Sequence, residues 1–170
     1  MKKFIYATIF LLVSATAQIH AQTFMDRIHF EFSAGTGIKN NGIKPVDFSF
    51  KSFVEFISIS YLFVTVEDNI SLYNENGTKN YFKGASIGGG LGVKLLNHTK
   101  SNHALDIRAK ALSSVGCPAW KRSSYDLSLA WYIKSYRFSP IVELGYRFID
   151  SHTSGLGNYG NAYLSIGFRY

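Results

Sequence analysis

Apolar and polar side chains alternate along the last eleven residues, 160–170, which read GNAYLSIGFRY. Counted back from the C-terminus in steps of two, the apolar positions are Tyr170, Phe168, Ile166, Leu164 and Ala162. Most positions between them are polar or small, as at Arg169, Gly167, Ser165 and Asn161. A period of two is that of a strand, whereas a helix repeats every 3.6 residues. We therefore predict a closing β-strand with one apolar face and one polar face.

The same alternation recurs upstream and predicts eight strands, over residues 28–38, 50–65, 70–73, 81–96, 104–112, 124–134, 137–149 and 160–170. In the second, Ile57, Ile59, Tyr61 and Phe63 share the apolar face, but Glu55 falls on it as well. A β-bulge near Glu55 would restore the phase. Longer polar connections, 39–49, 74–80, 113–123 and 150–159, alternate with shorter ones, 66–69, 97–102 and 134–136.

Glycines line the polar face of the predicted strand 81–96, at Gly84, Gly88, Gly90 and Gly92. Glycine weakens a strand, so a row of glycines calls for a structural reason. We expect them to make room in a narrow barrel for long charged side chains from the opposite wall.

These patterns predict an all-β chain that forms an eight-stranded antiparallel up-and-down transmembrane β-barrel. An even strand number, an apolar face toward lipid and a polar face toward the lumen are typical of such barrels. Long connections on one side and short ones on the other predict that both termini are periplasmic. The alternative is a lipocalin-like soluble barrel, which has an apolar core and a polar exterior. The many glycines and serines of the polar face would make a poor solvent surface, which favours the membrane barrel.

The N-terminus predicts a cleaved signal peptide over residues 1–21. It begins MKK, continues with the apolar run FIYATIFLLV and ends in small residues, so cleavage after Ala21 is expected, with Ala17 as the alternative. About 149 residues then remain, 22–170, which is one domain by length. No later apolar run reaches the 18 residues of a transmembrane helix candidate.

Charge and cysteine content narrow the possible partners. The formal net charge of +7 falls to +5 once Lys2 and Lys3 leave with the signal peptide. The remaining charges are scattered, with no basic and aromatic run typical of a nucleic-acid interface. The single cysteine, Cys117, cannot form an intrachain disulfide.

The closing strand resembles that of small outer-membrane β-barrels. Leu164, Ile166, Phe168 and Tyr170 match the terminal pattern that the barrel-assembly machinery reads in that class. The resemblance implies a place in the Gram-negative outer membrane, contact with outer-membrane lipid and lipopolysaccharide, and a possible extracellular ligand held by the long loops. Aromatic residues near strand ends suit the membrane interfaces. They are Tyr61, Tyr81, Trp131, Tyr146, Phe148, Phe168 and Tyr170.

Charged side chains on the polar faces are expected to point into the barrel. They are Glu31, Asp106, Asp126 and Glu143, with Lys94, Arg108, Lys110, Arg147 and Arg169. Buried charges persist when they are paired, so we predict an ion-pair network that fills the lumen. The alternative is a narrow, ion-selective path. Strand directions predict two pairs, Glu31 with Arg169, and Arg108 with Glu143.

Residues 152–154, HTS, are the one stretch that hints at catalysis. They resemble the H-x-S of outer-membrane lipid A deacylases, which implies an ester hydrolase using Ser154, His152 and an acidic residue. In that family the acid lies on the last strand, but residues 154–170 contain no Asp or Glu, which leaves Asp150 as the substitute. We therefore expect a non-enzymatic outer-membrane barrel with a role in envelope structure, surface interaction through the long loops or limited small-solute passage. The lipid A-modifying hydrolase is the alternative. No cofactor or metal is expected, and His98 and His103 are predicted to be solvated at a turn.

Overall fold

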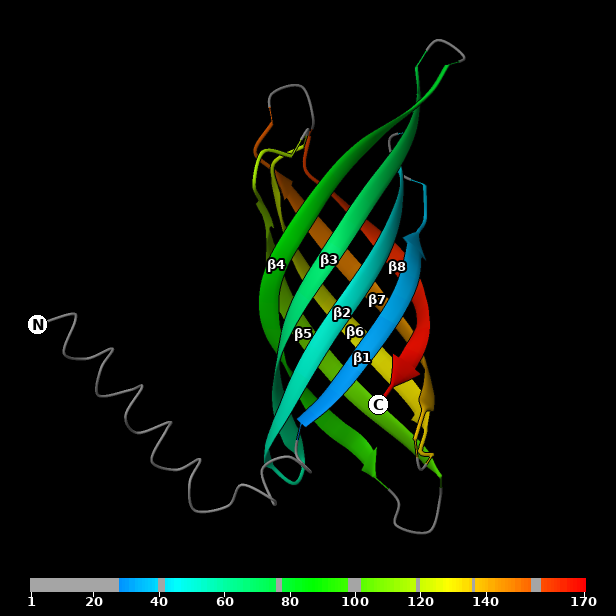
Figure 1. The fold of residues 1–170 in the computed structure, drawn as a ribbon. Coiled ribbons are helices and arrows are strands. Elements are labelled where there is room, and N and C mark those ends of the chain that lie inside the picture. Colours follow the sequence, from blue (N-terminus) through cyan, green and yellow to red (C-terminus); the bar gives the residue numbers. More distant parts are fainter. Residues whose placement is uncertain are drawn as a thin grey trace, which may run out of the picture.

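The computed structural model describes residues 28–39, 42–75, 78–97, 102–118, 120–135, 137–153 and 157–170. The predicted signal peptide lies outside these residues. The eight strands of Figure 1 are β1 (Ile28–Gly37), β2 (Lys44–Ile57), β3 (Ser60–Glu75), β4 (Thr78–Asn97), β5 (His103–Val115), β6 (Arg122–Ile133), β7 (Ser139–Ser151) and β8 (Tyr159–Arg169).

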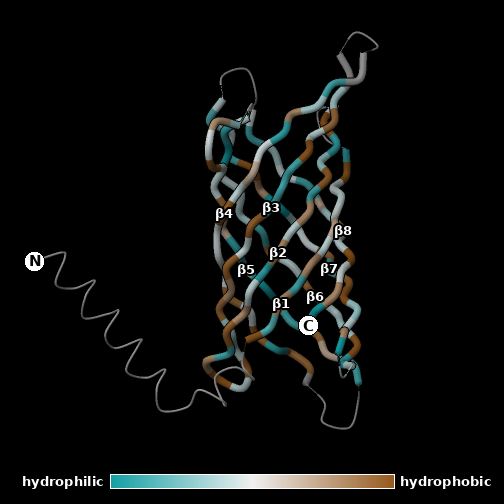
Figure 2. The backbone as a smooth tube through the Cα atoms, viewed as in Figure 1, coloured by the Kyte–Doolittle hydropathy of each residue, from teal (hydrophilic) through white to brown (hydrophobic). Residues whose placement is uncertain are grey.

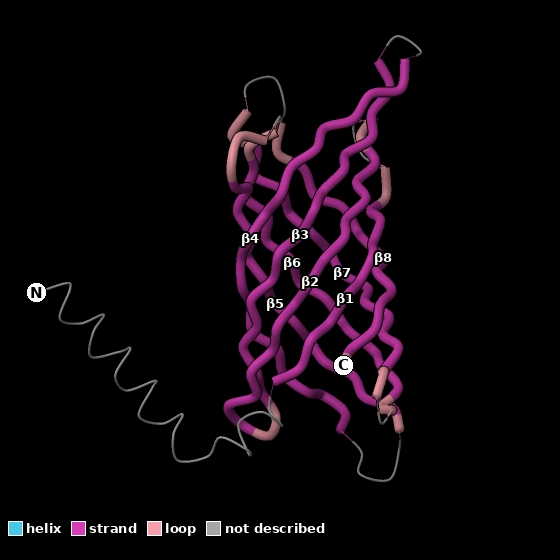
Figure 3. Tube along the Cα trace, in the orientation of Figure 1, coloured by secondary structure: helices cyan, strands magenta, loops and turns pink. Residues whose placement is uncertain are grey.

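Each strand pairs antiparallel with its neighbours in sequence, and β8 pairs with β1 to close the barrel. Strand covers almost all of the described chain (Figure 3). Within these residues, no helix is long and apolar enough to span a membrane. β1 begins and β8 ends at the lower end in Figure 1, and the β3–β4 hairpin protrudes at the upper end. The predicted eight-stranded antiparallel barrel is confirmed.

The predicted boundary between the second and third strands is wrong. The chain turns at residues 58–59, so β2 ends at Ile57 and β3 begins at Ser60. The expected turn at 66–69 instead lies inside β3, which also absorbs the predicted strand 70–73. The alternation misled because Tyr61 and Phe63 point into the barrel, where they are 1% and 4% exposed. A large inward aromatic has the same hydropathy as a lipid-facing one.

The predicted loop 39–49 is shorter than expected, since β2 begins at Lys44. β3 and β4 are the longest strands, and they continue together past the residues that pair with β2 and β5. These extensions form the hairpin that rises above the barrel in Figure 1.

The exterior of the barrel is apolar and the interior is polar. Hydrophobic and hydrophilic residues alternate along the strands in Figure 2. On β8, Phe168 and Ile166 are 59% and 61% exposed, whereas Asn161, Ser165 and Arg169, at the alternate positions, are buried. The predicted assignment of alternate side chains to the outer and inner faces is confirmed for β1 and for β4 to β8. Trp131, Tyr146 and Phe148 face outward as predicted.

The glycines of β4 make room for aromatic rings of the adjacent strand. Gly92 is opposite Tyr61 and Gly90 is opposite Phe63. A Cβ on Gly92 would lie 2.2 Å from the Tyr61 ring, and one on Gly90 would lie 2.6 Å from the Phe63 ring. The expectation that these glycines accommodate charged side chains from the opposite wall is therefore wrong for Gly90 and Gly92, because rings of the adjacent strand occupy that space.

Candidate functional site

The barrel interior contains equal numbers of buried acidic and basic side chains among the described residues. The six acids are Glu31, Asp47, Glu67, Asp106, Asp126 and Glu143. The six bases are Lys51, Arg108, Lys110, Arg122, Arg147 and Arg169. Isolated charges are costly to bury, so a network with no net charge is the arrangement that a closed interior tolerates.

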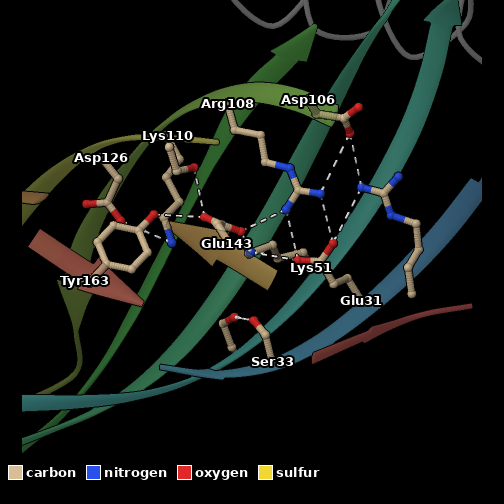
Figure 4. A network of polar contacts seen from close by, with 12 residues as sticks. Glu31, Ser33, Lys51, Asp106, Arg108, Lys110, Asp126, Glu143 and Tyr163 are labelled. Carbon is tan, nitrogen blue, oxygen red and sulfur yellow. Dashed lines mark hydrogen bonds and ion pairs between the residues drawn. The ribbon is translucent and has the colours of Figure 1, made fainter. Parts of the chain in front are cut away.

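Arg108 is the centre of one group of these charges (Figure 4). Its guanidinium donates to both carboxylate oxygens of Glu31, at 3.0 and 3.1 Å, and to Glu143 at 2.9 Å. Its Nε donates to the Tyr61 hydroxyl at 2.9 Å. Lys51 joins the same two carboxylates, 2.8 Å from Glu31 and 2.7 Å from Glu143. These contacts connect five strands, which are β1, β2, β3, β5 and β7.

A second group of charges lies above it and is centred on Arg147. Arg147 contacts Asp126 at 2.8 Å, Asp47 at 2.7 Å and Glu67 at 3.0 Å. Lys110 also pairs with Glu67, and its Nζ lies 3.2 Å from Asp126. Arg147 thus connects β7 to β2, β3 and β6 across the lumen.

Aromatic rings close the lower end around Arg169. The Arg169 guanidinium carbon lies 4.3 Å from the Tyr132 ring centroid and 4.7 Å from that of Phe53. Its Nη2 is also 3.5 Å from Glu31 and 3.6 Å from Asp106. Cation–π contacts and ion pairs therefore hold one guanidinium across this end.

A second aromatic cluster closes the upper end. Trp120 is 4% exposed, stacks on Tyr159 at 5.9 Å, and lies 6.1 Å from Phe82 of β4. The indole nitrogen of Trp120 donates to Ser151 Oγ at 2.8 Å, which fixes the ring over the opening. Arg122 lies beneath it, 4.9 Å from the indole ring.

Two small cavities lie beside the charged network. A cavity of about 10 Å³ lies beside Glu67, Lys110 and Arg147, and another of the same volume lies near Arg122. Each volume is close to the minimum that one water requires. The described interior is therefore a packed, ion-paired core.

The structure places eight of the nine predicted interior charges in this core. The ninth, Lys94, lies at the lower end, where its Nζ is 2.6 Å from Glu55. Glu55 points inward with it, and the register of β2 against β3 shifts between Glu55 and Ile57, so the irregularity predicted near Glu55 is present. Both predicted pairs are present, with Arg108 2.9 Å from Glu143 and Arg169 3.5 Å from Glu31.

Sequence reasoning missed Asp47, Lys51, Glu67 and Arg122. Three of them lay in the predicted loops 39–49 and 113–123 or the predicted turn 66–69, where charges are ordinary. Lys51 lay in the predicted strand 50–65. The inward and outward faces of that strand were assigned the wrong way round, so Lys51 was not expected to point into the barrel. The available signal was the alternation of Asp47, Ser49 and Lys51 with Phe48 and Phe50.

The described residues include only two of the three catalytic candidates, His152 and Asp150. Ser154 lies outside the described residues. The ring of His152 is instead 3.0 Å from the hydroxyl of Ser123, an outward residue of β6 that is paired with Asp150. Among the described residues, no hydrogen bond or ion pair joins Asp150 to His152.

No metal site is formed by the described His, Cys, Asp and Glu side chains. His103 stacks on Trp131 with 5.5 Å between ring centroids, and His98 lies outside the described residues. Cys117 is a free, exposed thiol at the upper end.

An apolar exterior around a charged interior is the construction of a transmembrane β-barrel. A lipocalin-like barrel has the opposite arrangement, with an apolar interior. Large apolar side chains face outward on all eight strands; examples are Phe32, Phe50, Val64, Leu91, Leu105, Leu127, Leu144 and Ile166. The fold is thus a transmembrane barrel.

No protein-family model matches the chain, and no curated protein is significantly similar to it. Among solved structures, the chain is similar to the outer membrane protein Ail of Yersinia pestis in a phospholipid nanodisc. That match has 15% identity and a TM-score of 0.45, and it covers 84% of this chain and 99% of Ail. The chain is also similar to the de novo designed protein TMB2.3, with 12% identity, a TM-score of 0.38 and coverage of 83% and 91%.

Proposed function

We propose that the protein is a non-enzymatic, non-conducting barrel of the Gram-negative outer membrane that serves envelope structure and presents an interaction surface outside the cell. The packed interior is the observation that carries this proposal. Arg108 and Arg147 fill the lumen with ion pairs, and aromatic clusters close both ends. Solute passage would require these charges to separate, so an envelope-anchored surface role is the better fit.

The upper end is proposed to face outward and the lower end the periplasm. The lower β2–β3 connection is only two residues long, 58–59, and the upper end carries the protruding hairpin. Outer-membrane barrels have short periplasmic turns and longer extracellular connections. Both termini would then be periplasmic, and the closing strand would be available to the barrel-assembly machinery.

The upper part of the β3–β4 hairpin is the proposed interaction surface. Pairing of β4 with β5 begins at Ala85. Among the described residues, the edge of β4 that faces away from β3 therefore has no strand beside it from Thr78 to Gly84. An open edge offers backbone donors and acceptors to an added strand. The hairpin is held in place because Tyr73 stacks on Phe82 with 4.5 Å between centroids.

Photo-crosslinking in intact cells tests the surface role. A photoreactive amino acid at Tyr81, on the hairpin, is expected to capture an extracellular macromolecule. The same amino acid at Leu127, on the lipid-facing wall, is the control and is expected to capture lipid only. Identical products at both positions would contradict the proposal.

Reconstitution tests the non-conducting barrel. The purified protein is expected to need detergent, to migrate differently on gels before and after boiling, and to add no ion conductance to a planar bilayer. A steady conductance would show that the ion-paired core opens and would overturn the proposal.

A further inference from the structure

An apolar groove crosses the outside of the barrel at the seam between β8, β1 and β2. It has a volume of about 780 Å³, and its lining includes Phe32, Ala34, Phe48, Ile166 and Phe168. A second hollow of about 500 Å³ continues it toward the lower end and shares Phe32 and Phe168. We call the two together the seam groove.

A small side chain between large ones creates the hollow. Ala34 is paired with Phe48 on one side and with Ile166 on the other, and all three face outward. One step lower, Phe32 lies between Phe50 and Phe168, so rings flank the hollow below Ala34. The wall formed by β4 and β5 has no comparable group of phenylalanines among the described residues. Its outward side chains include Leu91, Ile107 and Ala109.

Basic side chains lie just above the groove. Asp68 lines its upper margin, and Lys83 is 4.0 Å from the Asp68 carboxylate. Lys44 faces outward four residues above Phe48 on β2, and it has no ion-pair partner among the described residues. The outward-facing charge above the groove is therefore positive on balance.

We propose that the seam groove holds one acyl chain of an anionic membrane lipid, with Lys44 and Lys83 as the contacts for its phosphate. Figure 1 shows β1 and β2 side by side, inclined to the long axis of the barrel. The lining is almost wholly apolar, which matches a hydrocarbon chain. The phosphate would then lie at the height where the exterior first becomes charged. This inference rests on the proposed outer-membrane location and specifies the lipid partner.

A second copy of the chain fits the groove less well. A two-fold dimer that spans a membrane has its axis along the membrane normal, so each residue meets the partner at the same height. Lys44 and Lys83 of both copies would then approach one another, and like charges repel. An anionic lipid removes this conflict because it supplies the opposite charge.

Native mass spectrometry of the full-length, detergent-purified protein provides the test. The probes are phosphatidylglycerol and phosphatidylcholine with identical acyl chains. We expect one phosphatidylglycerol to remain bound, and Lys44→Gln to weaken its retention about fivefold, the effect of roughly one lysine at an anionic lipid surface. Lys121→Gln, on the far side of the upper end, is the matched control and is expected to change nothing.

A second pair of variants tests the acyl chain. Ala34→Phe fills the groove and is expected to abolish lipid retention, whereas Ala109→Phe on the opposite wall is expected to leave it intact. Val142→Phe, at another margin of the groove, replaces Ala34→Phe if that variant does not fold. Equal retention by the groove variant and Ala109→Phe, equal retention of both lipids, or a stable dimer without bound lipid would overturn the inference. A change in gel migration on boiling, measured on the same samples, shows separately whether each variant forms a closed barrel.

Discussion

Removing the Arg108 side chain is expected to destabilise the barrel more than any single change on its exterior. Arg108 is almost fully buried and makes three hydrogen bonds to two carboxylates and one to Tyr61. Arg108→Met keeps most of the side-chain length but leaves Glu31 and Glu143 with Lys51 as their main shared cation.

The expected loss of unfolding free energy in Arg108→Met follows from the carboxylate charge that is left buried without its partner. Breaking a buried pair by removing one partner costs about 3–5 kcal/mol, because the other charge stays buried. Glu143→Gln should cost less, since the hydroxyls of Ser128 and Tyr163 donate to its Oε1 at 2.9 and 2.8 Å and can still donate to an amide oxygen. The double variant Arg108→Met/Glu143→Gln removes both charges, so it should lose at least about 1 kcal/mol less than the sum of the single variants.

Equilibrium urea unfolding in detergent micelles, followed by tryptophan fluorescence and by the shift in gel migration on boiling, measures these free energies. The control pair is Lys94 with Glu55, whose side chains are 10% and 23% exposed at the lower end. Lys94→Met should cost about 1 kcal/mol or less, because a partly solvated pair contributes little. If the Arg108 and Glu143 effects add within about 0.5 kcal/mol, the two side chains are not coupled and the ion-paired core is not what stabilises the barrel.

Three further measurements address other parts of the molecule. Gly92→Ala should cost about 1–3 kcal/mol in the same unfolding assay, because the new Cβ overlaps an aromatic ring, whereas Gly157→Ala, which meets nothing within 4 Å, should stay within about 0.5 kcal/mol. A membrane-impermeant maleimide should label Cys117 in intact cells if the upper end faces outward, and labelling only after lysis would reverse the proposed orientation. Expression should leave the mass of lipid A unchanged, and a loss of acyl chains that Ser154→Ala or His152→Ala prevents would instead establish a hydrolase.

Several features could be read from the sequence because they depend on period-two alternation alone. The lipid-facing row of β8, from Leu164 to Phe168, and the inward Arg169 follow from parity once one strand is recognised. The same holds for Asp106, Arg108 and Lys110 on β5, whose other face is apolar. Parity also predicted the Arg108–Glu143 pair, since strand direction fixes the height of each residue.

Parity failed where the interior is aromatic. Phe53, Tyr61 and Phe63 point inward, so the hydropathy of β2 and β3 does not reveal which face meets lipid. The turn at 58–59 was consequently missed, and Glu67 was assigned to a turn. Local sequence cannot distinguish a ring that fills the lumen from one that faces a membrane, because both environments exclude water.

The sequence by itself determined the fold class and the direction of most side chains, since alternation is a local property of each strand. Only the tertiary structure decided which charges meet, because Arg147 reaches Asp47 across a separation of 100 residues and only barrel closure brings them together. It also decided that rings cover both ends, with Trp120 above and Tyr132 around Arg169 below. The alternation predicted a polar lumen, and the packing of side chains from facing walls made that lumen a closed core.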